Sequence, residues 1–398
     1  MFLWTVAKKA TTNCYTLFSI INFISIFVSE VNNENMIDSI SIKNYKNLSG
    51  LEVPHLARIN LISGKNNIGK SSFLEAVGLH ISDDMLFTIF DARGELYKSS
   101  PSRNDFDYET QNQDTFSSLF TGRNSKVSKD NEIKINDGNN SLSIRFVKYI
   151  ETDGDDLVSK KVVVLSGDED SIDARIALEL YRDDKNKVLL PVGRRYDRLR
   201  YTERLRREDI QRLVMVSPNN EYERMNPKFW DAITLTSKEE HVIRALQIID
   251  SGIESLAYLE PYSYGDRYPV VKIKDSEGRV PLKSMGDGIN HILSIILALV
   301  NCENGCVLID EIDNGLHYTV QKKLWEIVFE LSTMLNVQVF ATTHSSDCIS
   351  SFSKVLSNKT NQSIAKYIRL ESKAGKIVAN EYNCEELNIV AAQNIEIR

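Results

Sequence analysis

Two short segments, far apart in the chain, carry residue types that together could bind a nucleotide and move a proton. The first is the segment 64–71, Gly-Lys-Asn-Asn-Ile-Gly-Lys-Ser, which lies between an apolar run and a helix-like pattern. Its glycines let the backbone curl so that successive N–H groups point at phosphate, and the start of a helix adds partial positive charge. The residues that we assign to this phosphate-binding loop are Gly64, Asn66, Asn67, Gly69, Lys70, Ser71 and Ser72.

The chemistry expected of this loop is that of a bound ATP. Lys70 should reach the β- and γ-phosphates, and the Ser71 hydroxyl should ligate Mg²⁺. The alternative, a glycine-rich turn without a ligand, fits poorly with the strand-like and helix-like patterns on its two sides.

The second segment is Cys-Val-Leu-Ile-Asp-Glu at 306–311. A short apolar strand places two acids at its carboxyl end, where open α/β sheets bind ligands. Asp310 would complete the Mg²⁺ shell, and Glu311 would act as the general base that polarises the attacking water. Two acids can also end a strand by chance, but the phosphate-binding loop upstream favours the functional interpretation.

Two weaker motifs lie elsewhere along the chain and could contribute residues to the same site. Ser-Met-Gly-Asp-Gly at 284–288 precedes an apolar helix pattern and could form a second anion site through Ser284 and Gly286. Thr-Thr-His-Ser at 342–345 follows a strand pattern, and His344 could sense the γ-phosphate. Taken alone, the first is equally a helix cap and the second a structural histidine.

Hydrophobic periodicity predicts the elements that must position these residues. Strands are expected at 37–43 and 58–63, and a helix at 71–80. From 281 onward helices and strands alternate, with a helix at 289–300 and strands at 306–309 and 337–341. Such alternation implies a parallel sheet, and therefore an α/β protein.

The middle of the chain, from about 97 to 260, has other sequence patterns. Residues 97–130 are polar and are expected to be loop-rich, whereas 131–190 are β-rich with a hairpin signal at 137–140. An insert at about 191–260 begins with an arginine-rich stretch and ends with a helix expected at 237–251. We predict one ATPase domain over 36–398 with a β-rich lobe insert at about 131–190.

In this order, the four motifs resemble those of ABC-type ATPases of the SMC, RecF and OLD group. The loop spelling is similar to that of the OLD-like branch, and Asn-Gly-Leu-His at 314–317 matches the D-loop that follows the acids. The resemblance covers about 36–398. It implies an ABC-type P-loop NTPase fold, with a mostly parallel core sheet, an antiparallel β lobe and a helical lobe.

The resemblance also implies a mechanism. ATP and Mg²⁺ on one subunit are closed by Ser284 and Gly286 of another, so the working unit is a homodimer or a higher homo-oligomer. Relatives of the stand-alone OLD-like kind, without a Toprim nuclease domain, act with a separately encoded effector in antiphage defence or DNA repair. Met285 and Asp287 depart from the usual signature, and Gln111 and Gln113 are only candidates for the Q-loop.

Two other functions stay open. The chain could be the nucleotide-binding subunit of a membrane transporter, which the apolar segment Tyr15–Ser29 favours slightly. It could also be a scaffold that binds ATP without hydrolysing it. We expect the dimeric switch ATPase, because the His344 motif, the signature spelling and the β-rich lobe fit it better, and we expect no membrane partner.

Overall charge does not decide whether nucleic acid is a ligand. The net charge is −7, so DNA binding would require a local basic surface. In the stretch 194–212 eight arginines are interleaved with four acids. This stretch could bind DNA, contact a protein partner, or form a solvated helix with internal ion pairs.

The N-terminal segment contains an apolar run that could contact a membrane. The run Tyr15–Ser29 is 15 residues long, below the roughly 20 that span a bilayer. We interpret 1–35 as a doubtful extension ahead of a natural start at Met36, with a membrane-associating segment or an ordered extension as alternatives.

Five scattered cysteines are typical of a reducing, cytoplasmic setting. Cys302, Cys306 and His291 lack the further ligand pair of a zinc site.

Overall fold

The structure, a computed structural model, describes residues 36–82, 108–153, 160–164, 173–183, 186–193, 212–218, 225–261, 266–286, 288–358 and 360–392. Within it, Ile37–Arg398 forms one compact unit. The predictions for the extension 1–35 and for nearly all of the arginine-rich stretch 194–212 lie outside the described residues.

A six-stranded sheet forms the core and carries the predicted motifs. Its strand order is β16-β15-β3-β14-β13-β9, and all neighbours are parallel except β15 and β16. β3, β13 and β14 are buried along their whole length, which explains why their residues are mostly apolar. The strands are β3 (Ile59–Gly64), β9 (Leu213–Val216), β13 (Cys306–Ile309), β14 (Gln338–Thr342), β15 (Ala365–Lys373) and β16 (Lys376–Tyr382).

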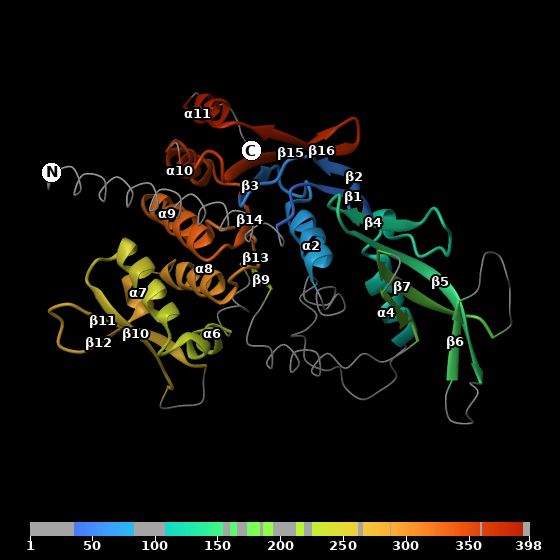
Figure 1. Ribbon diagram of the computed structural model, residues 1–398, viewed down its shortest axis with the longest axis horizontal. Helices are drawn as coiled ribbons and strands as arrows, with labels where there is room; N and C mark the ends of the chain where they lie inside the picture. The colour runs from blue at the N-terminus through green and yellow to red at the C-terminus, as the bar shows by residue number, and fades with distance from the viewer. Residues whose placement is uncertain are drawn as a thin grey trace, which may run out of the picture. The chain divides into compact units, whose positions relative to one another are not determined.

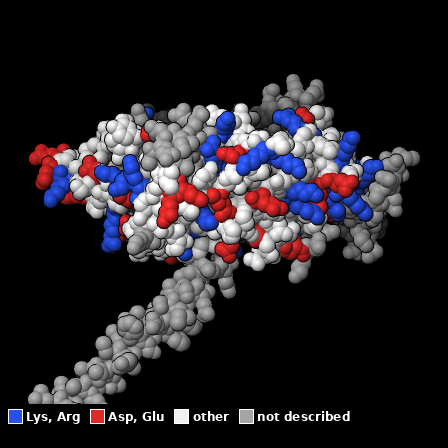
Figure 2. Space-filling model, turned by 90° about the horizontal axis from the view of Figure 1, so that it is seen from above, with Lys and Arg blue, Asp and Glu red and all other residues white. Residues whose placement is uncertain are grey.

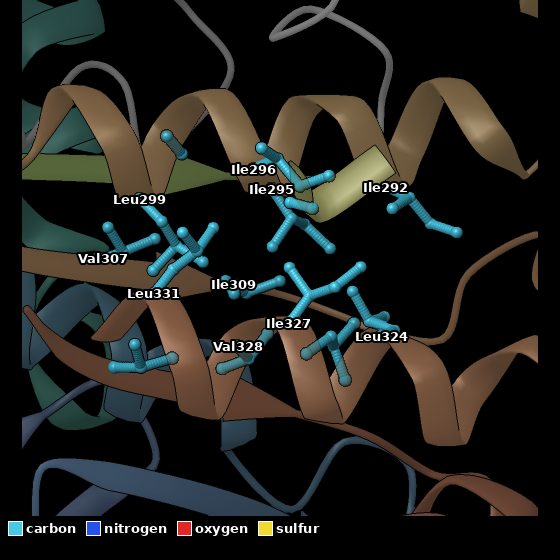
Figure 3. Close-up of a cluster of buried hydrophobic side chains, with 14 of the residues drawn as sticks. Ile292, Ile295, Ile296, Leu299, Val307, Ile309, Leu324, Ile327, Val328 and Leu331 are labelled. Carbon is cyan, nitrogen blue, oxygen red and sulfur yellow. The ribbon is translucent and has the colours of Figure 1, made fainter. Parts of the chain in front are cut away.

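Helices cover one face of this core sheet. α8 (Ile289–Asn301) and α9 (Tyr318–Met334) pack against each other, and α10 (Ser346–Leu356) packs on α9. Figure 3 shows isoleucines and leucines of α8 meeting those of α9, together with Val307 and Ile309 of β13. α11 (Cys384–Ala392) follows β16 and packs on α10.

The opposite face is covered by α2 (Lys70–Ile81), the helix that follows the phosphate-binding loop. α2 is buried on nearly all sides because it lies between the core sheet and a second sheet (Figure 1). Phe73, for example, meets Phe340 of β14 at a ring-centroid distance of 6.3 Å. A helix in this position needs apolar side chains on most sides, and the buried polar residues of α2, such as Glu75 and His80, have polar partners.

The second sheet is antiparallel and has seven strands, in the order β2-β1-β4-β5-β7-β8 with β6 paired to β5. The predicted hairpin is confirmed: β4 and β5 are joined by the turn at 137–140, where Asp137 Oδ1 accepts the N–H groups of Asn139 and Asn140. The strands are β1 (Ile40–Tyr45), β2 (Leu48–Val53), β4 (Glu132–Asn136), β5 (Ser141–Asp153), β6 (Lys160–Val164), β7 (Arg175–Arg182) and β8 (Asn186–Pro191).

Three polar contacts tie the far end of α2 to this antiparallel sheet. His80 Nε2 lies 3.0 Å from Asp137 Oδ2, and both side chains are buried. Arg182 donates to the carbonyl oxygens of His80 and Ser82 at 2.7 and 3.0 Å. A guanidinium at the C-terminal end of a helix satisfies carbonyls that have no partner within the helix.

The prediction of a loop-rich segment at 97–130 is wrong for part of its length. α4 (Tyr108–Ser117) is a helix, and a short 3-10 turn η1 (Thr121–Arg123) follows it. Phe116, Leu119 and Phe120 are fully buried in the core around α2 and the antiparallel sheet. These few apolar contacts stabilise a helix that the polar composition of the segment does not indicate.

A helical part with a small third sheet precedes α8. α6 (Asn226–Ile233) and α7 (Ser237–Ile249) pack on α8, and a three-stranded antiparallel sheet, β10-β11-β12, lies beside them. Its elements are β10 (Ile253–Leu259), β11 (Tyr268–Ile273), β12 (Arg279–Pro281) and the 3-10 turn η3 (Leu282–Met285). The range 191–260, expected as an insert, also contains β9, which pairs with β13 in the core sheet.

The described surface is charged but mixed. On the face shown in Figure 2, basic and acidic side chains alternate without a continuous area of one sign. Among the described residues, no helix combines the length and the apolar character needed to cross a membrane.

Candidate active site

The phosphate-binding loop connects β3 to α2 through a backbone that only particular residues tolerate. Gly64 has a φ of 145°, and a Cβ added there would lie 2.6 Å from the carbonyl oxygen of Leu370 on β15. Gly69 has a φ of 109°, and Asn67 also lies in the left-handed region at 60°. The two glycines therefore permit both the turn and the close packing of the loop against its neighbours.

Lys70, the first residue of α2, points back into the loop. Its Nζ donates to the carbonyl oxygens of Gly64 and Lys65 at 2.9 and 3.1 Å. Burial lowers the pKa of Lys70, and the negative charges of Asp310 and Glu311 oppose this shift. A cation held by two carbonyl oxygens and near two acids is placed to exchange those oxygens for those of an anion.

Ser71 and Asp310 meet although 239 residues separate them in the sequence. Ser71 Oγ donates to Asp310 Oδ2 at 2.9 Å, and Thr342 Oγ1 donates to Oδ1 of the same carboxylate at 2.5 Å. The parallel pairing of β13 and β14 brings these two strand ends together. A hydroxyl and a carboxylate are the hard oxygen ligands that Mg²⁺ prefers.

These protein ligands alone would not enclose a metal ion. Among the described residues, no group of three or more His, Cys, Asp or Glu side chains could hold one. Mg²⁺ usually binds through one or two protein ligands and completes its shell with waters and substrate phosphates. Ser71 and Asp310 therefore fit Mg²⁺ that arrives with a nucleotide.

Glu311 and His344 form the second pair at the same edge of the sheet. His344 Nε2 lies 3.0 Å from Glu311 Oε1, and both side chains are partly exposed. Glu311 has a φ of 53°, which is unusual for a residue with a side chain. Its N–H donates to Thr342 Oγ1 at 2.9 Å. The structure thus gives a carboxylate that is open to water and held by a histidine.

The remaining loop residues lie at the rim of the site. Asn66 and Asn67 are exposed, and Ser72 is partly buried on the first turn of α2. Asn47, in the turn between β1 and β2, donates from Nδ2 to the carbonyl oxygen of Asn67 at 3.2 Å.

Ser284 and Gly286 lie on a different element. Ser284 is exposed in η3 and donates to the carbonyl oxygen of Pro281 at 2.7 Å, so it does not open α8 directly as the motif indicated. Gly286 has a φ of 128°, and a Cβ there would meet no atom within 4 Å. An exposed hydroxyl beside an open glycine suits contact with a group from outside the subunit.

Sequence reasoning missed three residues of this region. Thr342 was noted only as part of a polar cluster, although its hydroxyl contacts both acids, and Asn47 carried no motif. His291 was considered only as a metal ligand beside Cys302 and Cys306, whereas its Nε2 hydrogen-bonds to the carbonyl oxygen of Ile312 at 3.2 Å. Gln113, a Q-loop candidate, lies on α4 and donates to Ser125 Oγ at 3.4 Å.

Comparison with known proteins found a matching family model and two proteins of similar sequence. A family model described as an AAA ATPase domain matches residues 219–349. A Helicobacter pylori protein named ATP/GTP phosphatase is 23% identical over 382 residues, which cover 88% of this chain and 97% of that protein. The uncharacterised protein MJECL10 of Methanocaldococcus jannaschii is 46% identical over 55 residues, 14% of this chain and 25% of that protein.

Among solved structures, the chain is similar at a low level to SMC heads. One is an SMC head bound to the C-terminal winged-helix domain of ScpA, with a TM-score of 0.47, 14% identity, and coverage of 90% of this chain and 99% of that chain. Another is the SMC head domain from Thermotoga maritima, with a TM-score of 0.43, 10% identity, and coverage of 87% and 98%.

The matched ATPase domain and the relative of similar length agree with the contact that the structure shows between Ser71 of the loop and Asp310. The chain has the mixed α/β fold predicted from its motifs, and the matched domain and the relative support ATPase activity.

Proposed function

We propose that this chain binds ATP with Mg²⁺ in the loop 64–72 and hydrolyses it with Glu311 as general base. The observation that carries this proposal is the contact of Ser71 with Asp310, because a hydroxyl and a carboxylate of the kind that bind Mg²⁺ then lie beside Lys70 and Glu311. Ser71 and Asp310 would hold Mg²⁺, which neutralises phosphate charge when bound. Lys70 would donate to the β- and γ-phosphate oxygens.

In this proposal His344 keeps the base in place. Its Nε2 lies 3.0 Å from one carboxylate oxygen of Glu311, and the other oxygen would accept a proton from water. Both side chains are partly exposed, so water can reach them. This arrangement is that of a positioned general base.

We further propose that the working form is a dimer in which Ser284 and Gly286 of one subunit close the ATP site of the other. Support comes from the exposure of both residues and from the resemblance of the motifs. The dimer would act as a switch on a separately encoded effector in DNA repair or antiphage defence, a role that rests on the resemblance alone.

Substitution of Lys70 tests the site. Lys70→Ala should abolish ATP binding, measured by isothermal titration with Mg²⁺ present, because the loop loses its cation. Lys43→Ala, at an exposed lysine of β1, is the matched control and should bind normally. Near-normal affinity in Lys70→Ala would contradict the proposed site.

Substitution of Glu311 tests the chemistry. Glu311→Gln should keep ATP binding and reduce steady-state phosphate release by about 100-fold or more, because an amide cannot accept the proton. ATP and GTP should be compared, since the H. pylori relative is named for both. A wild-type protein that binds ATP without releasing phosphate would indicate the non-hydrolysing scaffold instead.

A further inference from the structure

The first turn of α8 is packed directly against the segment that follows the two acids. A Cβ added to Gly288 would lie 2.4 Å from Leu316 Cδ2 and 2.7 Å from the carbonyl oxygen of Gly315. The φ of Gly288 is −76°, which any residue can adopt. The close approach of the two segments, rather than backbone conformation, therefore requires glycine here.

One helical turn later, His291 adds a polar contact to the same segment. Its Nε2 lies 3.2 Å from the carbonyl oxygen of Ile312, and the backbone of Glu311 is a second hydrogen-bond neighbour. Burial lowers the pKa of His291 and so favours the neutral ring. In the neutral ring the nitrogen that faces a carbonyl oxygen must carry the proton, so Nε2–H donates.

The backbone that His291 contacts is the strained part of the site. Glu311, at a φ of 53°, is held from β14 by Thr342, whose hydroxyl accepts the Glu311 N–H and whose carbonyl accepts the Ile312 N–H at 3.0 Å. His291 holds the same stretch from α8. A side-chain-bearing residue persists in the left-handed region only when its surroundings fix it.

Two buried polar atoms near this contact have no partner among the described residues. They are Asn290 Oδ1, beside His291 on α8, and Gln321 Oε1 on α9, whose own Nε2 donates to the carbonyl oxygen of Leu316 at 3.4 Å. Unpaired buried oxygens are costly. A contact that switches between two states needs a second arrangement of α8 and its neighbours. In such an arrangement these two oxygens would gain hydrogen-bond partners.

We propose that His291 is a positioning residue that ties the helix behind the signature motif to the backbone of the general base. Ser284 and Gly286 precede this helix by a few residues, so their capture of another subunit's ATP would displace the first turn of α8. The displacement would reach Glu311 of the same subunit through His291 and Gly288. One ATP site would thereby control the base of the other, an inference that rests on the proposed function.

The experiment compares two substitutions of His291 in the full chain. His291→Phe keeps a ring and removes the donor, whereas His291→Gln keeps an N–H donor at the same number of bonds from Cα. His291→Phe should lower kcat by up to about 100-fold, the scale of loss when a reacting group is misplaced. The ATP dissociation constant should be unchanged. The Hill coefficient for ATP, which can approach the number of sites, should fall to one.

Rescue and controls separate this role from a structural one. His291→Gln should recover both kcat and the Hill coefficient. Gly288→Ala attacks the same contact without touching the histidine and should reproduce the loss. His241→Phe, at a partly buried histidine of α7, should leave all three quantities as in the wild type.

The outcomes are distinguishable from failure of the proposed function. If the wild type releases no phosphate, the proposed function fails first. If the wild type is active and His291→Phe keeps its kcat and Hill coefficient, the inference about His291 is wrong. Unchanged kinetics in Gly288→Ala would likewise overturn it, even if His291→Phe could not be purified in folded form.

Discussion

Thr342 shows how one hydroxyl can organise a whole site. It donates to Asp310 Oδ1 at 2.5 Å and accepts the N–H of Glu311 at 2.9 Å, so it fixes the proposed metal-binding acid and the proposed general base relative to each other. The side chain is fully buried at the end of β14, where water cannot replace either bond. Both acids would lose a defined position without it.

The substitution Thr342→Val removes this hydroxyl and keeps the shape of the side chain. The free energy of unfolding should fall by about 1–3 kcal/mol, because the N–H of Glu311 is left without a partner. Urea denaturation measures this, and phosphate release should fall as well. Thr333→Val, which removes a hydroxyl bonded at 2.8 Å to the Phe329 carbonyl on α9, is the control and should leave phosphate release unchanged.

The cysteines allow a second test at the scale of single residues. Burial raises the pKa of Cys302 to about 12 and raises those of Cys306 and Cys348 as well. These thiols stay protonated at pH 9 and unreactive, since the thiolate is the nucleophile. Among the described cysteines, iodoacetamide should label only the partly exposed Cys384 in the native protein, as mass spectrometry would show. Rapid labelling of Cys302 would contradict the packing around β13.

At the scale of elements, α2 carries both proposed site residues and a buried ionisable side chain. Its N-terminal end holds Lys70 and Ser71, and its middle carries Glu75, which is buried beside Tyr45 and Lys46. Burial raises the pKa of Glu75, although the Lys46 ammonium and the Tyr45 hydroxyl oppose the shift. The ionised carboxylate is therefore less favourable in the folded chain than in the unfolded one.

This pKa shift predicts a pH dependence of stability. A carboxyl whose folded pKa is raised contributes stability below its ordinary pKa of 4.5, and this contribution is lost as the pH rises through the folded value. Glu75→Gln cannot ionise, so its free energy of unfolding should fall less than that of the wild type between pH 4.5 and neutrality. Urea denaturation across this range tests it, with the exposed Glu240→Gln as control. Parallel pH profiles for wild type and Glu75→Gln would contradict the assignment.

The elements also show what the sequence could predict. The expected strand at 306–309 coincides with β13, and the expected helix at 289–300 differs from α8 by one residue. These segments are buried on all sides, so their apolar runs have clear ends. β9 was missed because its four residues form a strand only by virtue of the partner β13 that it pairs with.

The sequence motifs indicated the candidate residues of the site, but not the hydrogen bonds that hold them in place. Motif spacing identified Lys70, Ser71, Asp310 and Glu311, and parallel strands bring their backbones to one edge. The roles of Thr342 and His291 depend on hydroxyl and ring positions at distances of about 3 Å, which no periodicity encodes. The catalytic and binding roles of all these residues stay predictions until the substitutions are tested.

At the scale of the whole molecule, the two halves of the proposed ATP site lie on separate elements. The P-loop lies between β3 and α2, and Ser284 is exposed on η3. In a head-to-tail dimer each ATP would contact both subunits, so association and ATP binding would be coupled.

This coupling predicts the oligomeric state. Glu311→Gln with ATP and Mg²⁺ should run as a dimer in size-exclusion chromatography with light scattering, because unhydrolysed ATP holds the subunits together. Adding Ser284→Arg should return it to a monomer while ATP still binds. Ser372→Arg, at an exposed serine of β15, is the matched control and should remain dimeric. A dimer that survives Ser284→Arg would place the closing residue elsewhere.

Asp137 and Arg182 hold the C-terminal end of α2 against the antiparallel sheet through their contacts with His80 and Ser82. The helix has 12 residues and is therefore about 18 Å long, with the phosphate-binding loop at one end and the β4–β5 hairpin at the other. A helix of this length hardly compresses, so a shift of the loop along its axis would displace the hairpin turn by nearly the same amount.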